Sequence, residues 1–436
     1  MGISLDGLAS GLDTTSLISA LMQVEAIPQT QLKSKSTGIQ SMVSALQGLN
    51  SKVAALATQA AAVAKPGALD LYSATTSSDK IAATTTSAAK AGSIDFQVDK
   101  LAQTQVTVTN KVVGWPYTTM TITSGGQSIT VTPLTSSLDD VVMAVNAAGA
   151  GVVATKVAVG GGEFRLQFAA TKSGSAGAFT ISDPGTTFTN AKDAQDAELQ
   201  LWAGSPAAMT VKSSTNTFTD VLPGVSITAK EITALATLTV ARDDAGITKL
   251  ASDLVTGANG IFSLVASKTA VSSTATSTTG GIFTGDSTVR SVNQSILSAA
   301  SLPVGTPPRS PSEIGISITK TGTMEFDEKK FSAALAADPA GVGAKVQEIA
   351  TRIAAAATKA SDKYDGTLTT KISGQESEVR DLADRITDWD VRLALRKTSL
   401  QRTYSALEVA LSGMQAQQSW LTAQLSGLSS SGSNSA

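Results

Sequence analysis

The segment IQSMVSALQGLNSKVAALATQAAAV (residues 39–63) carries apolar residues in alternating steps of three and four. The members of this series are Ile39, Met42, Leu46, Leu49, Val53, Leu56, Ala60 and Val63. Because residues at this spacing share one face of a helix, the pattern predicts a long helix with a coiled-coil seam. Pro66 and Gly67 follow and mark its end. The alternative is ordinary packing in a helical bundle, where short seams of this kind also occur.

A shorter helix is predicted before this one. Asp13 or Thr14 can cap its start by accepting a hydrogen bond from a free backbone N–H. Its apolar face consists of Leu17, Leu21 and Val24. Pro28 follows, and because proline clashes with the preceding helical turn, we expect a kink or break near Ile27. This face could serve a secretion signal, a buried core or an interface with another chain.

Two targeting signals do not fit the N-terminal sequence. No Lys or Arg precedes Lys33, so the positive region of a cleaved signal peptide is missing. The start MGISLD has Asp6 where a myristoylation motif needs Ser or Thr. We therefore expect a protein without a cleaved leader, and the apolar face of the first helix is better explained as an interface.

The C-terminal end has a second long seam. Its first part is Val379, Leu382, Ile386, Trp389 and Leu393. Arg396 interrupts the pattern with an eleven-residue stutter, and then the seam continues with Leu400, Tyr404, Leu407, Leu411, Met414, Gln418, Leu421, Leu425 and Leu428. The two terminal helices are expected to pair antiparallel, and the Ser/Gly tail SSSGSNSA (residues 429–436) to be disordered. The packing of Trp420 in the seam is favoured over a role as a recognition anchor.

Charges of both signs occupy the first half of this last helix. Pairs four residues apart, such as Asp381–Arg385 and Asp388–Arg392, are consistent with a solvated helix face. The same charges could instead select a partner along a coiled coil. The sequence leaves both interpretations open.

The middle of the chain, residues 73–245, predicts strands. Segments such as SIDFQVDKL, MTITS and EFRLQF alternate apolar and polar residues, with Gly- and Pro-containing turns between them. The sequence TKVAVGGGEFRLQF predicts a hairpin around three glycines, and one helix is expected at 138–149. We expect this insert to form two small β-rich domains.

Helical periodicity returns at residue 243. The helix that carries Ile247 to Leu264 is expected to pack against the 39–63 helix, and a Ser/Thr loop follows at 271–280. Val289, Val292 and Ile296 then define another helix. IGISITKTGTMEF predicts a hairpin with its turn at Thr321–Gly322. Beyond it, Phe331 and Leu335 lie on a helix, and Asp338–Pro339 starts a further one.

Composition excludes several classes of function. The chain has no Cys and no His, so a thiolate nucleophile, a Ser-His-Asp triad and a metal site with Cys or His ligands cannot form. A net charge of −2 argues against nucleic-acid binding. No run of about 18 apolar residues occurs, so no membrane insertion is expected. We predict no catalytic, cofactor-binding or metal-binding residues.

One enzyme class still has partial motif matches. SSDK (77–80), SAAK (87–90), SVN (291–293) and KTG (320–322) follow the order of a penicillin-interacting serine acyl enzyme. Neither S-x-x-K match is followed by a helical pattern, so chance matches in Ser/Thr-rich sequence are favoured. Asp362, Asp365 and Gly366 hint at a calcium loop, but Ile372 stands where a bidentate Glu is needed, which favours a plain turn.

Several segments resemble the flagellar filament cap family, also called flagellar hook-associated protein 2. At the N-terminus the resemblance is carried by GLASGLDTTSLISALMQVEAIPQTQL (7–32). Further along, it is carried by SSTNTFTDVLPGVSITAK (213–230), GIFTGDSTVRSV (281–292), IGISITKTGTMEFDEKKFSAALAADPAGV (314–342), YDGTL (364–368) and YSALEVALSGMQAQQSWLTAQL (404–425). Trp420 stands where that family often has Tyr, which leaves the packing of the seam intact.

The resemblance implies a secreted structural protein at the distal end of the bacterial flagellum. Such proteins are exported unfolded through the flagellar type III channel, form a ring-shaped homo-oligomer and promote flagellin polymerisation. Implied partners are a second copy of the chain, flagellin and an export chaperone; adhesion of the head to a host surface is possible. Flagellin itself or a hook–filament junction protein is the alternative within the same class.

The resulting prediction is a multidomain α plus β protein. Its expected parts are terminal coiled-coil legs, disordered in the free monomer, at 1–40 and 385–436; a helical bundle stalk with a small hairpin at 41–72 and 246–384; a β-rich head domain at 73–110 and 206–245; and a second one at 111–205. The predicted assembly interface is Leu17, Leu21, Val24, Leu400, Tyr404, Leu407, Leu411, Met414, Leu421 and Leu425.

Overall fold

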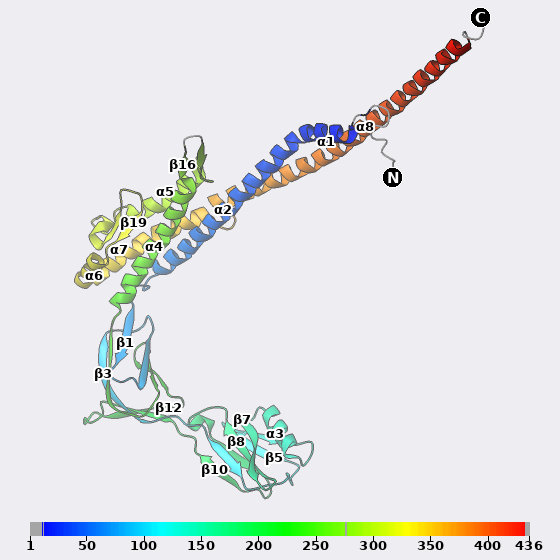
Figure 1. Cartoon of the computed structure of the whole chain (residues 1–436). Coiled ribbons are helices and arrows are strands. Elements are labelled where there is room, and N and C mark those ends of the chain that lie inside the picture. Colours follow the sequence, from blue (N-terminus) through cyan, green and yellow to red (C-terminus); the bar gives the residue numbers. More distant parts are fainter. Residues whose placement is uncertain (1–10, 12, 275–276, 432–436) are drawn as a thin grey trace. The chain divides into compact units, whose positions relative to one another are not determined.

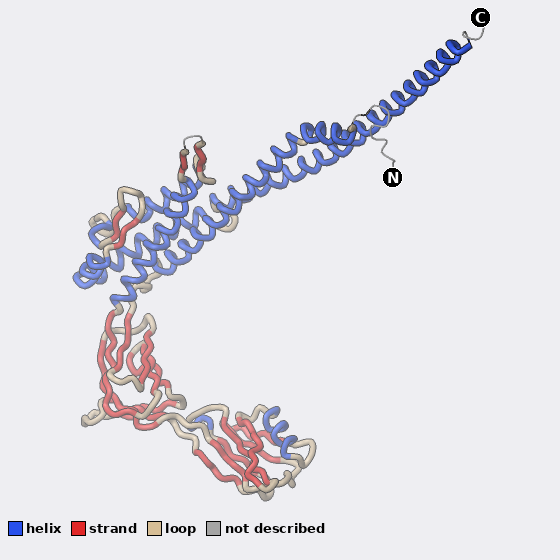
Figure 2. The backbone as a smooth tube through the Cα atoms, viewed as in Figure 1, coloured by secondary structure: helices blue, strands red, loops and turns tan. Residues whose placement is uncertain are grey.

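The computed structural model describes residue 11 and residues 13–274 and 277–431. The first residues of the N-terminal signature, Asp6 and the end of the Ser/Gly tail lie outside the described residues. The chain forms two compact units: a helical unit, up to Ala64 and from Ala251 onward, and a β unit, Lys65–Leu250. Figure 2 shows helices in the first and strands in the second, which confirms the predicted mixed α plus β architecture with helical ends and a β-rich insert.

The N-terminal helices are α1 (Thr14–Glu25) and α2 (Ile27–Val63). Asp13 caps α1, since its carboxylate accepts the N–H of Ser16 at 2.8 Å. The predicted break near Ile27 is confirmed: Ala26 alone separates the two helices, and Pro28 occupies the first turn of α2. In that turn a proline replaces no intrahelical donor, so α2 can begin directly after the bend.

The seam of α2 is the core of the helical unit. Six of its predicted members are buried: Leu46, Leu49, Val53, Leu56, Ala60 and Val63. Val43 is buried where Met42 was predicted to be. This face packs along α7 (Pro339–Ser361) and α8 (Thr367–Ser431). The seam therefore contributes to a bundle of several helices rather than to a two-stranded coiled coil alone.

Helix α4 (Asp244–Thr269) approaches α2 closely at Gly257. A Cβ atom there would lie 2.8 Å from Oε1 of Gln59 and 3.1 Å from Cδ1 of Leu56, so glycine allows this close approach and confirms the predicted packing. Among the described helices, α4 alone has the length and apolar composition of a membrane span. A core helix has the same composition, and Leu254 and Ile261 of α4 are buried in the bundle.

Helix α8 runs antiparallel to α1 and α2. Contacts along their length join residues of rising number in the N-terminal helices to residues of falling number in α8: Glu25 with Arg396, Gln29 with Asp390, and Lys35 with Glu378. This order confirms the predicted antiparallel pairing. Figure 1 also shows that α8 continues well past α1 towards the C-terminus, so the two ends differ in length.

The remaining elements of the bundle match the sequence predictions, with one exception. They are α5 (Ser287–Ser301), the hairpin β18 (Ile316–Ile318) and β19 (Met324–Phe326), and α6 (Glu328–Ala337). The short helix η2 (Pro311–Ile314), for which there was no prediction, precedes the hairpin. Val289, Val292 and Ile296 of α5 are buried, as are Phe331 and Leu335 of α6. Asp338 caps α7 by accepting the N–H of Gly341 at 2.9 Å.

The exception is the segment predicted as a Ser/Thr loop at 271–280. It forms an exposed two-stranded hairpin of β16 (Val271–Ser273) and β17 (Thr278–Gly280). Threonine has a high strand propensity, and hydroxyl pairs such as Ser273 with Thr278, 3.2 Å apart, stabilise opposed strands. A segment without apolar alternation gave no period-two signal, which is why the prediction was wrong.

The β unit contains two sandwiches of strands. In the first, the five-stranded sheet β1 (Tyr72–Thr76), β15 (Thr233–Arg242), β3 (Gly92–Lys100), β11 (Ala197–Leu201) and β12 (Met209–Ser213) packs on β13 (Thr217–Leu222), β14 (Val225–Ala229) and β2 (Ile81–Thr85). Buried Phe96, Val98, Phe218 and Leu238 belong to the core between these sheets. All pairings in both sheets are antiparallel.

The second sandwich adds a helix. Its strands are β10 (Phe188–Lys192), β4 (Val106–Thr109), β8 (Glu163–Ala170) and β7 (Val152–Gly160) in one sheet, and β6 (Gln127–Val131), β5 (Met120–Ser124) and β9 (Phe179–Ser182) in the other, with α3 (Leu138–Ala147) and η1 (Ser175–Gly177). Trp115, Ile122, Val141 and Phe168 lie in its core. The hairpin β7–β8 turns at Gly160–Gly162, all three with positive φ, as the glycine run predicted.

Two strands lie in a different sheet from the one that the expected domain ranges imply. Strand β4, within 73–110, joins the second sandwich, and β11, within 111–205, joins the first. We propose that the domain boundaries run near Gln103 and Gln195, where the two connecting segments pair with each other through a hydrogen bond of 2.8 Å. Alternation of apolar residues identifies a strand without identifying its partner, which explains the difference.

Candidate assembly surface

The charge of α8 changes abruptly along its length. Up to Arg402 the helix is rich in charged residues of both signs, whereas from Thr403 to Ser431 the only charged residue is Glu408. We call residues 403–426 of α8 the arm. A solvent-facing helix normally carries charged residues on its outer face. The composition of the arm is therefore typical of a helix that is buried against other surfaces.

The predicted interface residues on the arm lie largely in the open. Leu407, Met414, Leu421 and Leu425 are exposed, Leu425 to 61%. Leu400, which precedes the arm, and Tyr404 and Leu411 within it are half-buried. These residues form one apolar row because their spacing follows the turn of the helix. Trp420 is also exposed, at 63%, so the expectation that it packs in a seam is not met within the described chain.

The ion pairs of this region decide between the two interpretations of the mixed charges. Arg396 Nε lies 3.1 Å from Glu25 Oε1, and Lys35 Nζ lies 2.8 Å from Glu378 Oε1, so both pairs cross between helices. Asp390 accepts a hydrogen bond from Gln29 in the same way. These contacts favour selection of a partner helix over a merely solvated face. Sequence reasoning treated Arg396 as a fault in the seam and missed its partner.

A small cavity marks the place where α1 meets α8. It has a volume of about 350 Å³ and is lined by Leu21, Val24, Glu25, Pro28, Trp389, Arg396 and Leu400. It brings together three of the predicted interface residues, Leu21, Val24 and Leu400. Leu17 lies on α1 outside this lining, and Leu407 to Leu425 lie further along α8. The predicted interface thus divides into a cleft at the bend and the free arm.

Three exposed apolar side chains near the cleft were not predicted. Ile27, Val391 and Leu395 are each more than half exposed. Val391 and Leu395 are four residues apart on α8, so they extend the apolar surface on a second face of the helix. The spacing was visible in the sequence, but it was overlooked because the main seam ran beside it.

The motif matches for an acyl enzyme do not lie in the required structural context. Residues 77–80 fall between β1 and β2, residues 87–90 fall between β2 and β3, and residues 320–322 form the hairpin turn of β18–β19. That chemistry needs the Ser at the start of a helix and its Lys one turn later. These three segments therefore support the chance-match interpretation.

The suspected calcium loop is a turn between α7 and α8. Oδ1 of Asp362 accepts the N–H of Tyr364 at 2.8 Å and that of Asp365 at 2.9 Å. These hydrogen bonds, the one from Asp365 first, hold the pKa of Asp362 below its usual value. Within the described residues no group of three or more carboxylates is placed to hold a metal ion. The plain turn favoured by the sequence is what forms.

Asp286 connects the start of α5 to α8. Its carboxylate accepts the N–H groups of Thr288 and Val289 and lies 2.7 Å from Nζ of Lys371. Burial acts to raise the pKa of Asp286, but the hydrogen bond from Lys371 and those from the backbone outweigh it, so the pKa lies below its usual range. The group is thus charged at neutral pH and fixes two helices together.

Asp286→Asn is expected to lower the free energy of unfolding of the helical unit by about 1–3 kcal/mol at neutral pH. The amide keeps an acceptor for the cap but leaves Lys371 without its counter-charge. Because the folded pKa of Asp286 is depressed, its stabilisation is complete above the unfolded pKa of about 3.9 and is lost as pH falls through the folded pKa. Thermal unfolding across this pH range measures the gap between variant and wild type. A gap that stays constant in acid would contradict this role.

Helices at both ends of the chain, an apolar arm with a single charged residue and a β-rich insert together form the architecture of a structural subunit that assembles through its ends. The chain belongs to the flagellar hook-associated protein 2 family. The family model for the C-terminus of flagellar hook-associated protein 2 matches residues 194–416, and the model for its N-terminus matches residues 10–105. The family resemblance stated from the sequence is confirmed.

Relatives match between about three quarters and nearly all of the chain. Flagellar hook-associated protein 2 of Escherichia coli O157:H7 is 27% identical over 465 aligned residues, which cover 98% of this chain and 99% of the relative. The B-type flagellar hook-associated protein 2 of Pseudomonas aeruginosa PAO1 is 29% identical over 381 residues, covering 78% and 79%. A crystal structure of the D1-D2-D3 domains of the flagellar cap protein FliD from Escherichia coli matches with a TM-score of 0.62 at 26% identity, covering 76% of this chain and 99% of that one.

Proposed function

We infer that this chain is a structural cap at the distal end of the bacterial flagellar filament, where its copies form a homo-oligomer that promotes flagellin polymerisation. The observation that carries this function is the match of 76% of this chain to 99% of the crystal structure of a flagellar cap protein. The arm supports it, because an exposed row of Leu and Met side chains without charges gains stability only when another surface covers it.

Immunogold labelling of intact filaments tests this function. Antibodies against the β unit should label the distal tip alone in the bacterium that encodes the chain. Labelling along the whole filament would instead identify a flagellin, and labelling at the junction with the hook would identify a junction protein. Either of these patterns would overturn the cap function.

We propose that the chain leaves the cell unfolded through the flagellar type III export channel. Membership of the family supports this route, and the absence of cysteine means that no disulfide opposes unfolding. An export chaperone that covers the arm inside the cell is a further proposed partner. No catalytic role is proposed.

We also propose that the terminal legs, expected at 1–40 and 385–436, are the parts that order fully only on assembly. Most helix stability comes from packing, and the apolar row of the arm is more than half exposed at Met414, Leu421 and Leu425. Limited trypsin digestion of the free chain should therefore cut first after Arg402 and leave the bundle and the β unit intact. Protection of Arg402 in the monomer would contradict this expectation.

A further inference from the structure

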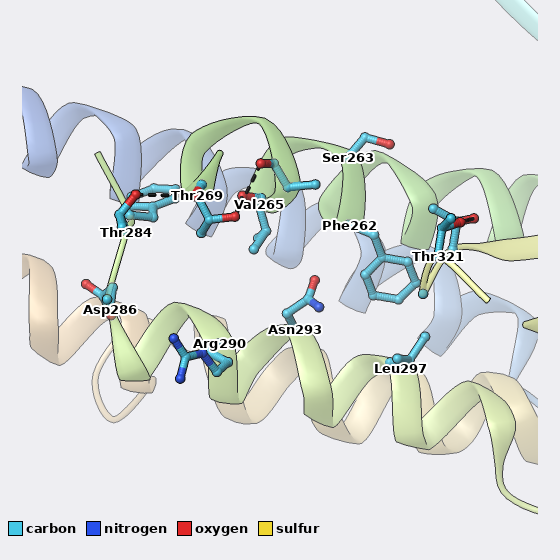
Figure 3. A pocket seen from close by; sticks show the side chains of 15 residues that line it. Phe262, Ser263, Val265, Thr269, Thr284, Asp286, Arg290, Asn293, Leu297 and Thr321 are labelled. Atoms are coloured by element: carbon cyan, nitrogen blue, oxygen red, sulfur yellow. Dashed lines mark hydrogen bonds between the residues drawn. The ribbon is translucent and has the colours of Figure 1, made fainter. Parts of the chain in front are cut away.

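A groove crosses the helical unit between α4, α5 and the turn of the β18–β19 hairpin. Its volume is about 570 Å³, and it is large enough to hold an aromatic side chain from another molecule. Its apolar walls include Phe262, Val265 and Phe283, which are buried, and Leu297. Figure 3 shows that Asn293 points from α5 into the space below α4, with Phe262 and Leu297 beside it.

The groove carries two polar groups that a ligand could satisfy. Oδ1 of Asn293 is buried and has no hydrogen-bond partner. A buried acceptor in this state costs free energy until a donor reaches it. One turn earlier on α5, Arg290 is exposed, and no ion pair to its guanidinium occurs within the described residues. The groove therefore suits a largely apolar side chain that carries a hydrogen-bond donor and has a carboxylate next to it.

The same unit presents such a group at another place. Tyr364, in the turn between α7 and α8, is 77% exposed, and Asp365 follows it. Both backbone N–H groups are held by the carboxylate of Asp362, so this turn is fixed before any partner arrives. A rigid, exposed tyrosine has the properties of an interface anchor because it buries a large ring at little cost in entropy. Its segment, YDGTL, has no other assigned part in the function beyond this turn.

We propose that Tyr364 and Asp365 of one copy dock in the α4–α5 groove of a second copy of this chain. The Tyr364 hydroxyl donates to Oδ1 of Asn293, its ring packs against the apolar walls, and the Asp365 carboxylate pairs with Arg290. The anchor and the groove are different surfaces of one unit. Copies joined in this way are arranged head-to-tail. They form a ring when the rotation from one copy to the next adds up to a full turn. This inference rests on the proposed function only in assuming that copies associate.

Disulfide trapping tests the contact directly, because the chain has no native cysteine. Lys363→Cys removes the ammonium that lies 5.4 Å from the centroid of the Tyr364 ring, but it leaves the hydrogen bonds that Asp362 accepts from Tyr364 and Asp365 in place. Ala266→Cys puts a thiol on an exposed residue that lines the groove. Mixing the two single-cysteine proteins and oxidising them should give a covalent dimer. Ser267→Cys is the matched control, since Ser267 is exposed on α4 but does not line the groove. Equal yields for the two α4 positions, or no dimer in a protein that still associates, would overturn the proposal.

Variants of the contact separate binding from folding. Tyr364→Ala should weaken self-association by roughly tenfold or more, as loss of an interface anchor does. Asn293→Leu should raise the melting temperature of the free chain, since it removes an unpaired buried acceptor, and should weaken association at the same time. Arg290→Glu and Asp365→Arg should each weaken association, and their combination should restore it. Sedimentation velocity and circular dichroism provide the two readouts. Association unchanged in Tyr364→Ala would refute the anchor.

Disulfide trapping and immunogold labelling test the contact and the cap function separately. Tip labelling without the 363–266 disulfide would leave the cap function in place and remove this contact. The disulfide without tip labelling would show a real association of copies in a protein of another function.

Discussion

A chain with Leu421→Asp is expected to fold like the wild type and yet fail to form a cap. Leu421 is 56% exposed on the arm, so an aspartate there meets water in the free chain and costs only about 0.7 kcal/mol in helix propensity. In the assembly the same carboxylate would be buried in an apolar seam without a partner. Burial of an unpaired charge costs roughly 3–5 kcal/mol of free energy. Leu411→Asp on the same row should act in the same direction.

Ala423→Asp is the matched control for Leu421→Asp. It places the same charge two residues further along the helix, about 200° around the axis, and so on the opposite face. Motility and electron microscopy of filaments measure assembly, and circular dichroism of the purified chain measures folding. Motile cells with normal filaments carrying Leu421→Asp would refute the role of the apolar row. Equal loss of function with Ala423→Asp would show that the arm is enclosed on all sides.

Leu49→Ala, unlike Leu421→Asp, is expected to reduce the stability of the free chain. Leu49 is fully buried where α2 packs along α7 and α8, so truncation removes apolar contacts and leaves a cavity. The expected loss is about 2–5 kcal/mol in the free energy of unfolding of the helical unit. Differential scanning calorimetry should show this transition shifted to lower temperature, while that of the β unit stays in place.

Leu425→Ala makes the same chemical change on the exposed arm. Because Leu425 is 61% exposed, its truncation should change the stability of the free chain by no more than about 0.5 kcal/mol. Comparable destabilisation by both variants would mean that the arm is already packed in the free chain. That outcome would also remove the reason for proposing that the arm orders on assembly.

The pair Leu49 and Leu421 shows how much of the fold could be predicted. Both lie in seams with the same three-four spacing, and the helices that carry them were predicted correctly. Periodicity indicates which face of a helix is apolar but not which other helix covers it. Burial of Leu49 and exposure of Leu421 therefore needed the structure. A second signal was present in the sequence, since charges nearly vanish after Arg402, and it would have separated the arm from the rest of α8.

Strand pairing was the least predictable part of the fold. Strands β4 and β11 were recognised as strand-like or lay within the predicted β-rich region, but their sheets were exchanged relative to the expected domains. Pairing partners far apart in sequence depend on packing of whole sheets, and alternation along one strand does not contain that information. The hydrogen-bonded crossing at Gln103 and Gln195 is likewise a tertiary feature.

The continuity of α8 has a mechanical consequence. From Thr367 to Ser431 the helix has no break, and at 1.5 Å per residue it is a rod of roughly 100 Å. Its first half is fixed in the bundle by contacts with α2 and α7, while the arm extends beyond α1. Once assembly has ordered the arm, a force or a torque applied to it acts on the bundle through one unbroken helix. A neighbour that binds the arm is then connected to the core of the helical unit without any flexible joint in between.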